Sequence, residues 1–214
     1  MRSKAHASLT EKAYHTLVHK IVTLDLPPGA VLTESHLMRE LKIGRTPIRE
    51  AVQRLIAEGL VKHLHHRGML VAEVLAADVQ QLYECRAEIE GFAARLAATR
   101  MTPAQVEELK RIHEGMDRVL SEADIESFVT QDRQFHALLG SGAGNRYLES
   151  FMVNVYNLHL RLWYYLFKTQ GEFKETVQDH QELISALVRR DPDDSERAMR
   201  KYVTRIARQI REVI

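Results

Sequence analysis

The chain has a single cysteine, Cys85, among its 214 residues. One thiol excludes an intramolecular disulfide framework and a zinc site built from several cysteines. Long apolar runs are also missing, because the longest one, around residues 158–167, is interrupted by Arg161. The start of the chain shows no basic segment followed by a short apolar one, as a secretory signal would. We therefore expect a cytoplasmic protein with neither an export signal nor a membrane span.

A strong excess of one charge is missing from the chain as a whole, whose formal net charge is +1. The charges are unevenly spread, however. Residues 1–75 carry 11 Lys/Arg and 7 Asp/Glu, whereas residues 76–214 carry 19 and 22. A basic front and a slightly acidic rear fit one region that binds nucleic acid and a second region with another role. The excess alone is too small to indicate DNA binding without a motif.

The most informative segment predicts an amphipathic helix over residues 45–58. Pro47 suits its first turn, Gly44 or Thr46 suits its cap, and Gly59 ends it. The apolar positions at helical spacing are Ile48, Val52, Leu55 and Ile56. The polar positions at the start of the helix are Arg45, Thr46 and Arg49. Long donors at the first turns of a helix whose back is anchored are what reading of the major groove requires.

The flanking segments extend this helix into a larger motif. Residues 33–41 predict a second short helix, capped by Thr33, with Leu37 and Leu41 on one face. Two helices so close together form a helix-turn-helix. Residues 60–74 predict two short strands with Gly68 in the turn, and such a hairpin is a wing. The residues predicted for the wing tip are His65, His66 and Arg67.

This front part, residues 1–75, resembles the winged helix-turn-helix domain of the GntR family of transcription regulators. The matching runs are Leu26–Leu32, Glu34, Gly44–Val52, Glu58–Val61 and Arg67–Val71. The family commonly has Ser at the position of Gly44, so one hydroxyl contact to the DNA backbone is lost here. By resemblance, the residues that contact double-stranded DNA are Arg45, Thr46 and Arg49 on the helix, with Arg67 and Gly68 on the wing.

The rear part, residues 76–214, reads as helix throughout, so the expected fold is mainly α. The predicted helices span residues 78–99, 103–121, 124–140, 145–169, 173–189 and 194–213. Turn and cap residues such as Thr102-Pro103 and Asp191-Pro192 separate them. An antiparallel helical bundle is the natural architecture for such a series.

Polar residues interrupt the apolar stripes of these helices. Asp132 and His136 are four residues apart and share one helix face. His180 precedes Asp191 by 11 residues, and Tyr202 follows it by 11. If the last two helices fold back at Asp191, both residues lie about 16 Å from the turn, side by side. One Asp, two His and a phenol around one point resemble a site for a divalent metal ion.

The same region resembles the FCD domain of FadR-type GntR regulators, in its six-helix, VanR-like form. The matching residues are Tyr83–Arg86, Glu90, Asp132–His136, Gly144-Asn145, Asp179-His180 and Leu183. Many members bind a metal through one Asp and three His. Asp132, His136 and His180 match three of these positions, and Tyr202 stands at the fourth. The resemblance implies a divalent ion such as Zn, Ni or Mn.

Tyr202 leaves two arrangements open, because a tyrosine is a poor ligand unless it is ionised, and its reference pKa is about 10. Three ligands could hold an ion whose open positions take water or an effector carboxylate. Alternatively the site is free of metal, and Tyr202 and His180 hold the effector directly.

We expect a small-molecule carboxylate as the effector. The candidate effector-binding residues are Arg86, Asn145, Arg161 and Tyr202. Arg86 is the best of them, since a guanidinium binds a carboxylate through two hydrogen bonds. Alternatively, Arg86 and Glu90 form only a surface pair.

The combined interpretation is a homodimeric repressor that reads a pseudo-palindromic operator and is not an enzyme. Two other classes remain open. One is a metal-dependent hydrolase that uses Asp132, His136 and His180. The other is a DNA-binding protein with an inert dimerisation bundle.

Overall fold

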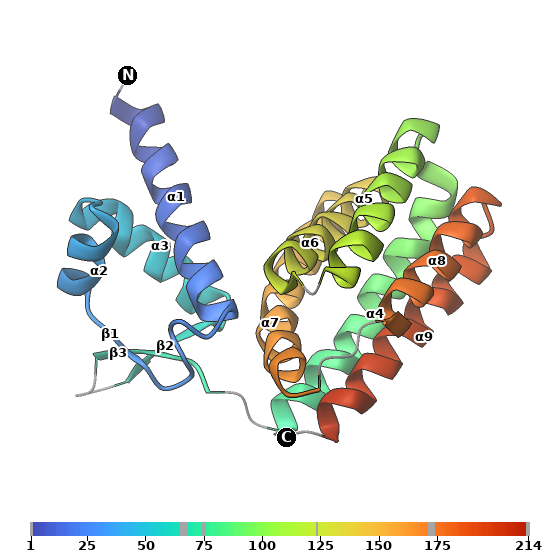
Figure 1. Cartoon of the computed structure of the whole chain (residues 1–214). Helices are drawn as coiled ribbons and strands as arrows, with labels where there is room; N and C mark the ends of the chain where they lie inside the picture. Colours follow the sequence, from blue (N-terminus) through green and yellow to red (C-terminus); the bar gives the residue numbers. More distant parts are fainter. Residues whose placement is uncertain (1, 65–67, 74–75, 123, 171–173, 213–214) are drawn as a thin grey trace. The chain divides into compact units, whose positions relative to one another are not determined.

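The computed structural model describes residues 2–64, 68–73, 76–122, 124–170 and 174–212 (Figure 1). Internal contacts divide the chain into two compact units. The first unit comprises residues 1–75 with residues 160–165, and the second comprises residues 76–159 and 166–214. In the described ranges the first unit combines helices with a small sheet, whereas the second is helical.

The first unit is a winged helix-turn-helix. Its elements are α1 (Arg2–Val22), β1 (Val31–Leu32), α2 (Glu34–Leu41), α3 (Arg45–Ala57), β2 (Val61–Leu64) and β3 (Gly68–Val71). Strand β3 lies between β1 and β2 and is antiparallel to both. The sequence predicted α2, α3 and the two strands of the wing. It gave no bounds for α1 and no strand at β1, which is two residues long and forms only by pairing with β3.

Local chemistry explains where α2 and α3 begin and end. The Thr33 side chain accepts a hydrogen bond from the backbone N–H of His36 (3.3 Å), as predicted for a cap. Lys42, with φ 55°, ends α2 in the left-handed region. Gly44 is the cap residue of α3 and makes no side-chain cap bond. Gly59 follows α3 with φ +74°, a conformation that favours glycine.

The core of the first unit explains the apolar stripe of α3. Ile48, Val52 and Leu55 are fully buried, together with Leu17 and Ile21 of α1. Ile56, which was predicted to face the core as well, is half-buried. Burial of this stripe anchors the back of α3 and leaves its other side in solvent.

The chain after residue 75 contains each of the six predicted helices, and residues 160–165 of the fourth one group with the first unit. The six helices are α4 (Ala76–Arg100), α5 (Pro103–Ser121), α6 (Ile125–Gly142), α7 (Arg146–Gln170), α8 (Lys174–Val188) and α9 (Pro192–Arg211). Every boundary lies within two residues of its prediction. In the described ranges, no helix combines the length and the apolar character needed to cross a lipid bilayer.

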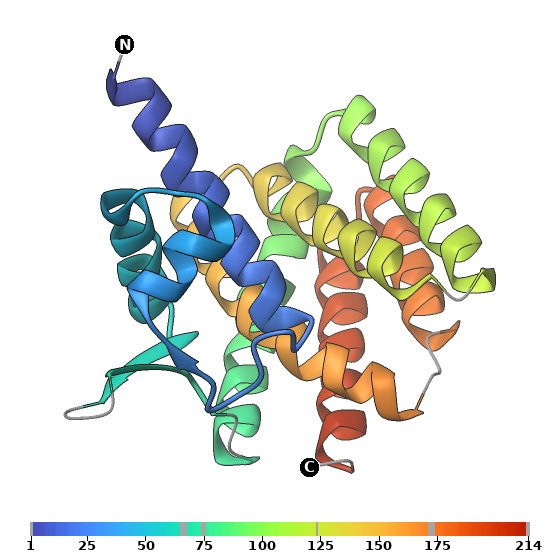
Figure 2. The same ribbon diagram turned by 60° about the vertical axis from the view of Figure 1, so that its left-hand side comes forward.

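Strong caps set these boundaries. Thr102 and Gln105 form a reciprocal capping box at the start of α5, and Pro103 occupies the first turn. Asp191 caps α9 by accepting a hydrogen bond from the N–H of Asp194 (3.0 Å). Arg190, with φ 54°, turns the chain back between α8 and α9. Figure 2 shows these two helices, in orange and red, side by side and antiparallel.

The helices of the second unit bring distant segments together. Helix α9 packs along α4 as well as along α8. Helix α5 packs against α6 and α8, and α6 also contacts α4. One buried layer therefore receives side chains from four helices, α4, α6, α8 and α9.

Candidate functional site

The exposed side of α3 carries the predicted DNA contacts. Arg45, Thr46 and Arg49 are all exposed, whereas the neighbouring Pro47 and Ile48 are buried. The first turns of α3 therefore project two arginines and a hydroxyl into solvent from an anchored helix. This is the geometry by which a recognition helix reaches base edges in the major groove.

Glu34, the first residue of α2, lies against these arginines. Its carboxylate accepts hydrogen bonds from Arg49 Nε (3.0 Å) and Arg49 Nη2 (3.2 Å). Arg45 Nε lies 4.0 Å from the same carboxylate. The hydrogen bonds from Arg49 lower the pKa of Glu34, so this carboxylate is ionised at neutral pH. Glu34 belongs to the sequence motif, but the sequence alone predicted no role for it.

The wing is described only in part. Gly68 opens β3 opposite Leu64 and has φ +77°, which explains why glycine stands there. His65, His66 and Arg67, predicted for the wing tip, lie outside the described residues. The DNA contact of Arg67 stays a prediction.

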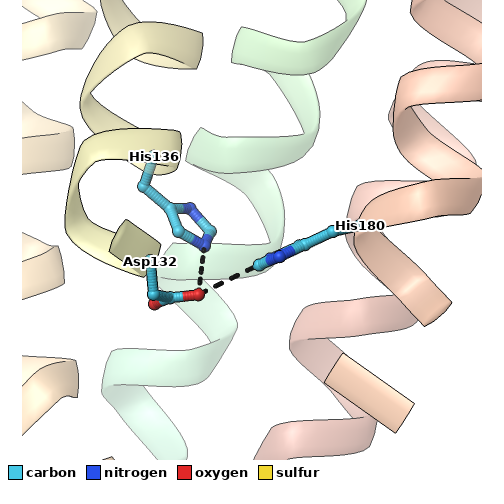
Figure 3. Close-up of side chains that lie close together, drawn as sticks. All are labelled: Asp132, His136 and His180. Carbon is cyan, nitrogen blue, oxygen red and sulfur yellow. Dashed lines mark ion pairs between the residues drawn. The ribbon is translucent and has the colours of Figure 1, made fainter. Parts of the chain in front are cut away.

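A buried cluster in the second unit joins Asp132 and His136 of α6 to His180 of α8 (Figure 3). The Nε2 atoms of His136 and His180 lie 3.9 Å and 3.7 Å from Asp132 Oδ1. One ligand atom from each residue falls within 4.8 Å of the others. The two imidazoles approach one carboxylate oxygen from different helices, so the three predicted residues do converge.

These donor atoms fit a metal ion. Asp132 Oδ1 and both Nε2 atoms are buried and make no hydrogen bond within the described part of the chain. A tetrahedral ion with bonds of about 2.0–2.1 Å separates its ligand atoms by about 3.3 Å. The distances of the two Nε2 atoms from Asp132 Oδ1 are slightly longer than this value. Buried donors without partners are costly, and an ion would satisfy all three.

Two further residues support the cluster. The Tyr156 hydroxyl of α7 donates a hydrogen bond to Asp132 Oδ2. Glu90 Oε2 of α4 lies 3.0 Å from Nδ1 of His136. A carboxylate at the far nitrogen of a metal-binding histidine fixes the ring and leaves Nε2 free for the ion. Neither residue was assigned to the metal site from the sequence.

The electrostatics distinguish Tyr202 from His180 as a metal ligand. Burial raises the pKa of Asp132, and His136 opposes this rise. Burial lowers the pKa of His180 well below its ordinary value, so the imidazole is neutral, as a metal ligand must be. Burial also raises the pKa of the Tyr202 phenol well above its ordinary value. A neutral phenol is a poor ligand, so Asp132, His136 and His180 are the better donors.

Tyr202 nevertheless lies where the sequence placed it. Its ring centroid is 4.9 Å from that of His180 and 5.7 Å from that of His136. Its hydroxyl is buried and makes no hydrogen bond among the described residues. The phenol therefore offers a hydrogen bond to a molecule that enters the cluster.

Arg86 and Glu90 are not a surface pair, because their side chains are 0% and 3% exposed. Arg86 Nε donates to Glu90 Oε1 at 2.5 Å. Burial alone would raise the pKa of Glu90, but Arg86 and His136 outweigh it and lower this pKa to about 2. Both terminal nitrogens of Arg86 are buried and make no hydrogen bond within the described ranges. Both nitrogens retain hydrogen atoms that could be donated to an anion.

The other two candidate effector residues lie outside this cluster. Asn145 is half-buried at the start of α7, where its Oδ1 accepts from the N–H groups of Tyr147 and Leu148, both at 3.2 Å. Arg161 lies in residues 160–165, which group with the first unit. The structure therefore brings Arg86 and Tyr202 to the cluster but not Asn145 or Arg161.

Comparisons with known proteins cover both units. The family profile "Bacterial regulatory proteins, gntR family" matches residues 9–71, and the FCD domain profile matches residues 81–205. An HTH-type regulator of Agrobacterium vitis is 32% identical over 140 residues, which are 64% of this chain and 82% of that protein. The HTH-type transcriptional repressor RspR of Escherichia coli K12 is 27% identical over 205 residues, 96% of this chain and 90% of that protein.

Solved structures agree in fold. The structure of E. coli McbR/YncC has a TM-score of 0.86 at 22% identity and covers 96% of this chain and 99% of that chain. A structure described as the metal-free FCD domain of TM0439 has a TM-score of 0.53 at 17% identity, over 66% of this chain and 96% of that one. At these identities, the likeness concerns the fold alone.

Proposed function

Because the chain belongs to the GntR family of bacterial regulators and carries an FCD domain, we propose that it is a ligand-responsive transcription repressor. The family and the named relatives make it a DNA-binding transcription regulator and not an enzyme, so the hydrolase alternative is set aside. We further propose that it forms a homodimer and binds a small carboxylate effector and a divalent metal ion.

We assign DNA reading to residues 1–75. Arg45, Thr46 and Arg49 would contact the major groove, and Arg67 and Gly68 would contact DNA from the wing. Support comes from the exposed first turns of α3 above a buried stripe. Two copies of this head fit a pseudo-palindromic operator, because half-sites repeat once for each protomer.

We assign metal binding to Asp132, His136 and His180. Three buried donor atoms without hydrogen bonds, and Glu90 behind His136, support this assignment. A Zn²⁺, Ni²⁺ or Mn²⁺ ion bound there supplies positive charge and coordination positions open to a carboxylate. Tyr202 contributes a hydrogen bond to the effector in place of a fourth protein ligand.

The observation that carries the effector proposal is the buried guanidinium of Arg86, with both terminal nitrogens unpaired in the described part of the chain. A buried charged donor without a partner is costly unless a ligand satisfies it. A small organic acid does so through a paired contact. The ion pair with Glu90 occupies only Nε of Arg86, so the two terminal nitrogens are the groups that an effector would bind.

We further propose that residues 76–214 dimerise and transmit the signal. Tyr147 and Phe151, one turn apart on α7, are 66% and 60% exposed and offer an apolar surface to a second copy. The effector would shift α9, which carries Tyr202, and release the operator. For this the effector must bind one state of the dimer more tightly than the other.

Elemental analysis and native mass spectrometry of the purified protein test the metal assignment. We expect a stoichiometric divalent ion that is lost in His180→Ala and retained in His15→Ala, a control histidine of α1 whose side chain is exposed. A metal-free wild-type protein would favour the alternative in which His180 and Tyr202 hold the effector directly.

Thermal denaturation with a panel of small carboxylic acids tests the effector assignment. A true effector raises the melting temperature of the wild type, because it binds the folded state. The same acid should have little effect on Arg86→Met. A flat response across the panel would support an inert dimerisation bundle instead.

A further inference from the structure

Glu34 determines which edge of the Arg49 guanidinium is available. A guanidinium can make a paired contact through Nε and one Nη, or through its two Nη atoms. Here Nε and Nη2 of Arg49 both donate to Glu34. The outer edge, formed by Nη1 and the second hydrogen of Nη2, is left for another partner. That edge makes the paired contact with guanine O6 and N7 when an arginine reads a base end-on.

Glu34 also places a negative charge beneath two exposed cations. The side chains of Arg45 and Arg49 are 69% and 59% exposed, whereas that of Glu34 is 28% exposed. Phosphates attract exposed cations whatever the base sequence. A carboxylate beside both arginines weakens this general attraction but leaves an oriented donor pair for a base edge.

We infer that Glu34 is a specificity-determining residue of the DNA-reading surface, which holds Arg49 for a base contact and weakens binding to unrelated DNA. Glu34 is a positioning residue, since it acts through Arg49. The inference rests on the proposed role of α3 in reading DNA.

The test compares two duplexes at one fixed salt concentration, with the full-length chain. One duplex is selected by the wild type from a random-sequence pool, and the other is a shuffled duplex of the same composition. Glu34→Gln should bind the shuffled duplex more tightly, and the ratio of the two affinities should fall by about tenfold or more. Loss of folded protein affects both duplexes equally, so the ratio remains readable even for a less stable variant.

Two further variants separate orientation from charge. Glu34→Asp keeps the charge but shortens the reach, so it should weaken binding to the selected duplex and leave the shuffled one unchanged. Glu40→Gln is the matched control, because Glu40 lies on the same helix and pairs with Lys20 at 2.7 Å. It should leave the ratio at the wild-type value.

The inference is wrong if Glu34→Gln keeps the wild-type ratio of the two affinities, or if Glu40→Gln lowers that ratio by the same factor. A different result is expected if the proposed role of α3 in reading DNA is wrong. In that case Arg45→Ala and Arg49→Ala would both leave binding to the selected duplex unchanged. If those variants lose binding and Glu34→Gln keeps its ratio, only the role of Glu34 is refuted.

Discussion

The two units place an arginine–glutamate pair in opposite environments. At the start of α3, Arg49 is 59% exposed and lies against Glu34. In the helical unit, the side chains of Arg86 and Glu90 are both nearly inaccessible. An exposed arginine can exchange its partner for DNA at little desolvation cost, whereas a buried one can be reached only by a ligand that enters the bundle. Burial, and not residue type, therefore separates the proposed DNA-reading surface from the proposed effector site.

The two pairs should also differ in how much each one affects the free energy of unfolding. Exposed ion pairs contribute little to stability, because water screens them. A buried pair costs desolvation, and removal of one partner leaves the other charge uncompensated. Variants of the two arginines therefore test this contrast.

Arg86→Ala should have the largest effect, a loss of about 3–5 kcal/mol in the free energy of unfolding, because ionised Glu90 then remains buried without its partner. Urea denaturation measures this loss. The control is Arg111→Ala, whose side chain is 69% exposed and pairs with Glu108. That variant should unfold almost like the wild type, and equal losses in both would contradict the contrast.

Arg49→Ala should weaken binding to the selected duplex roughly ten- to hundredfold, as expected for loss of one paired base contact. Its urea midpoint should stay near the wild-type value, because the side chain is largely exposed. An electrophoretic shift assay at fixed salt gives the affinity. Unchanged binding would remove Arg49 from the reading surface.

Tyr202→His should strengthen metal binding by about tenfold or more, because it restores the fourth ligand seen in many family members. Competition with a chelator measures the change in affinity. The matched control is Tyr14→His, in which the new histidine lies in the core of the first unit. Equal metal affinity in Tyr202→His and the wild type would argue against a metal at this cluster.

Gly44→Ser should have the smallest effect, a gain of a few tenths of a kcal/mol in stability. The extended backbone of Gly44 and the open space around its Cα accept a side chain that can cap α3. The variant also restores the hydroxyl common in the family, so binding to both duplexes should rise slightly. Thermal melting and the shift assay measure the two effects, and a lower melting temperature would contradict the expected cap.

Local signals made most of the fold predictable. The six helices of the rear bundle follow from apolar periodicity and from strong caps such as Thr102 and Asp191. The turn at Asp191 even placed His180 beside Tyr202. Helix α1 and strand β1 were missed. Strand β1 exists only through pairing with β3, which is distant in sequence, and no local sequence pattern predicts such a strand.

The candidate metal site was predictable only in its ligands. Asp132 and His136 share a face by simple spacing, the fold-back at Asp191 added His180 beside Tyr202, and the family resemblance agreed with all three ligands. Tyr156 carried no signal, because its contact with Asp132 depends on how α7 packs against α6. Glu90 was noticed as a partner of Arg86, but its burial and its approach to His136 could not be read from spacing.

The class of this protein follows from local properties of the chain, namely helix periodicity, caps and the motif around Arg45 and Arg49. Which charges lie in water and which lie in the interior is set in the folded molecule. That outcome depends on packing between distant helices. Packing leaves the pair of Glu34 and Arg49 exposed to water, and it removes the pair of Arg86 and Glu90 from water.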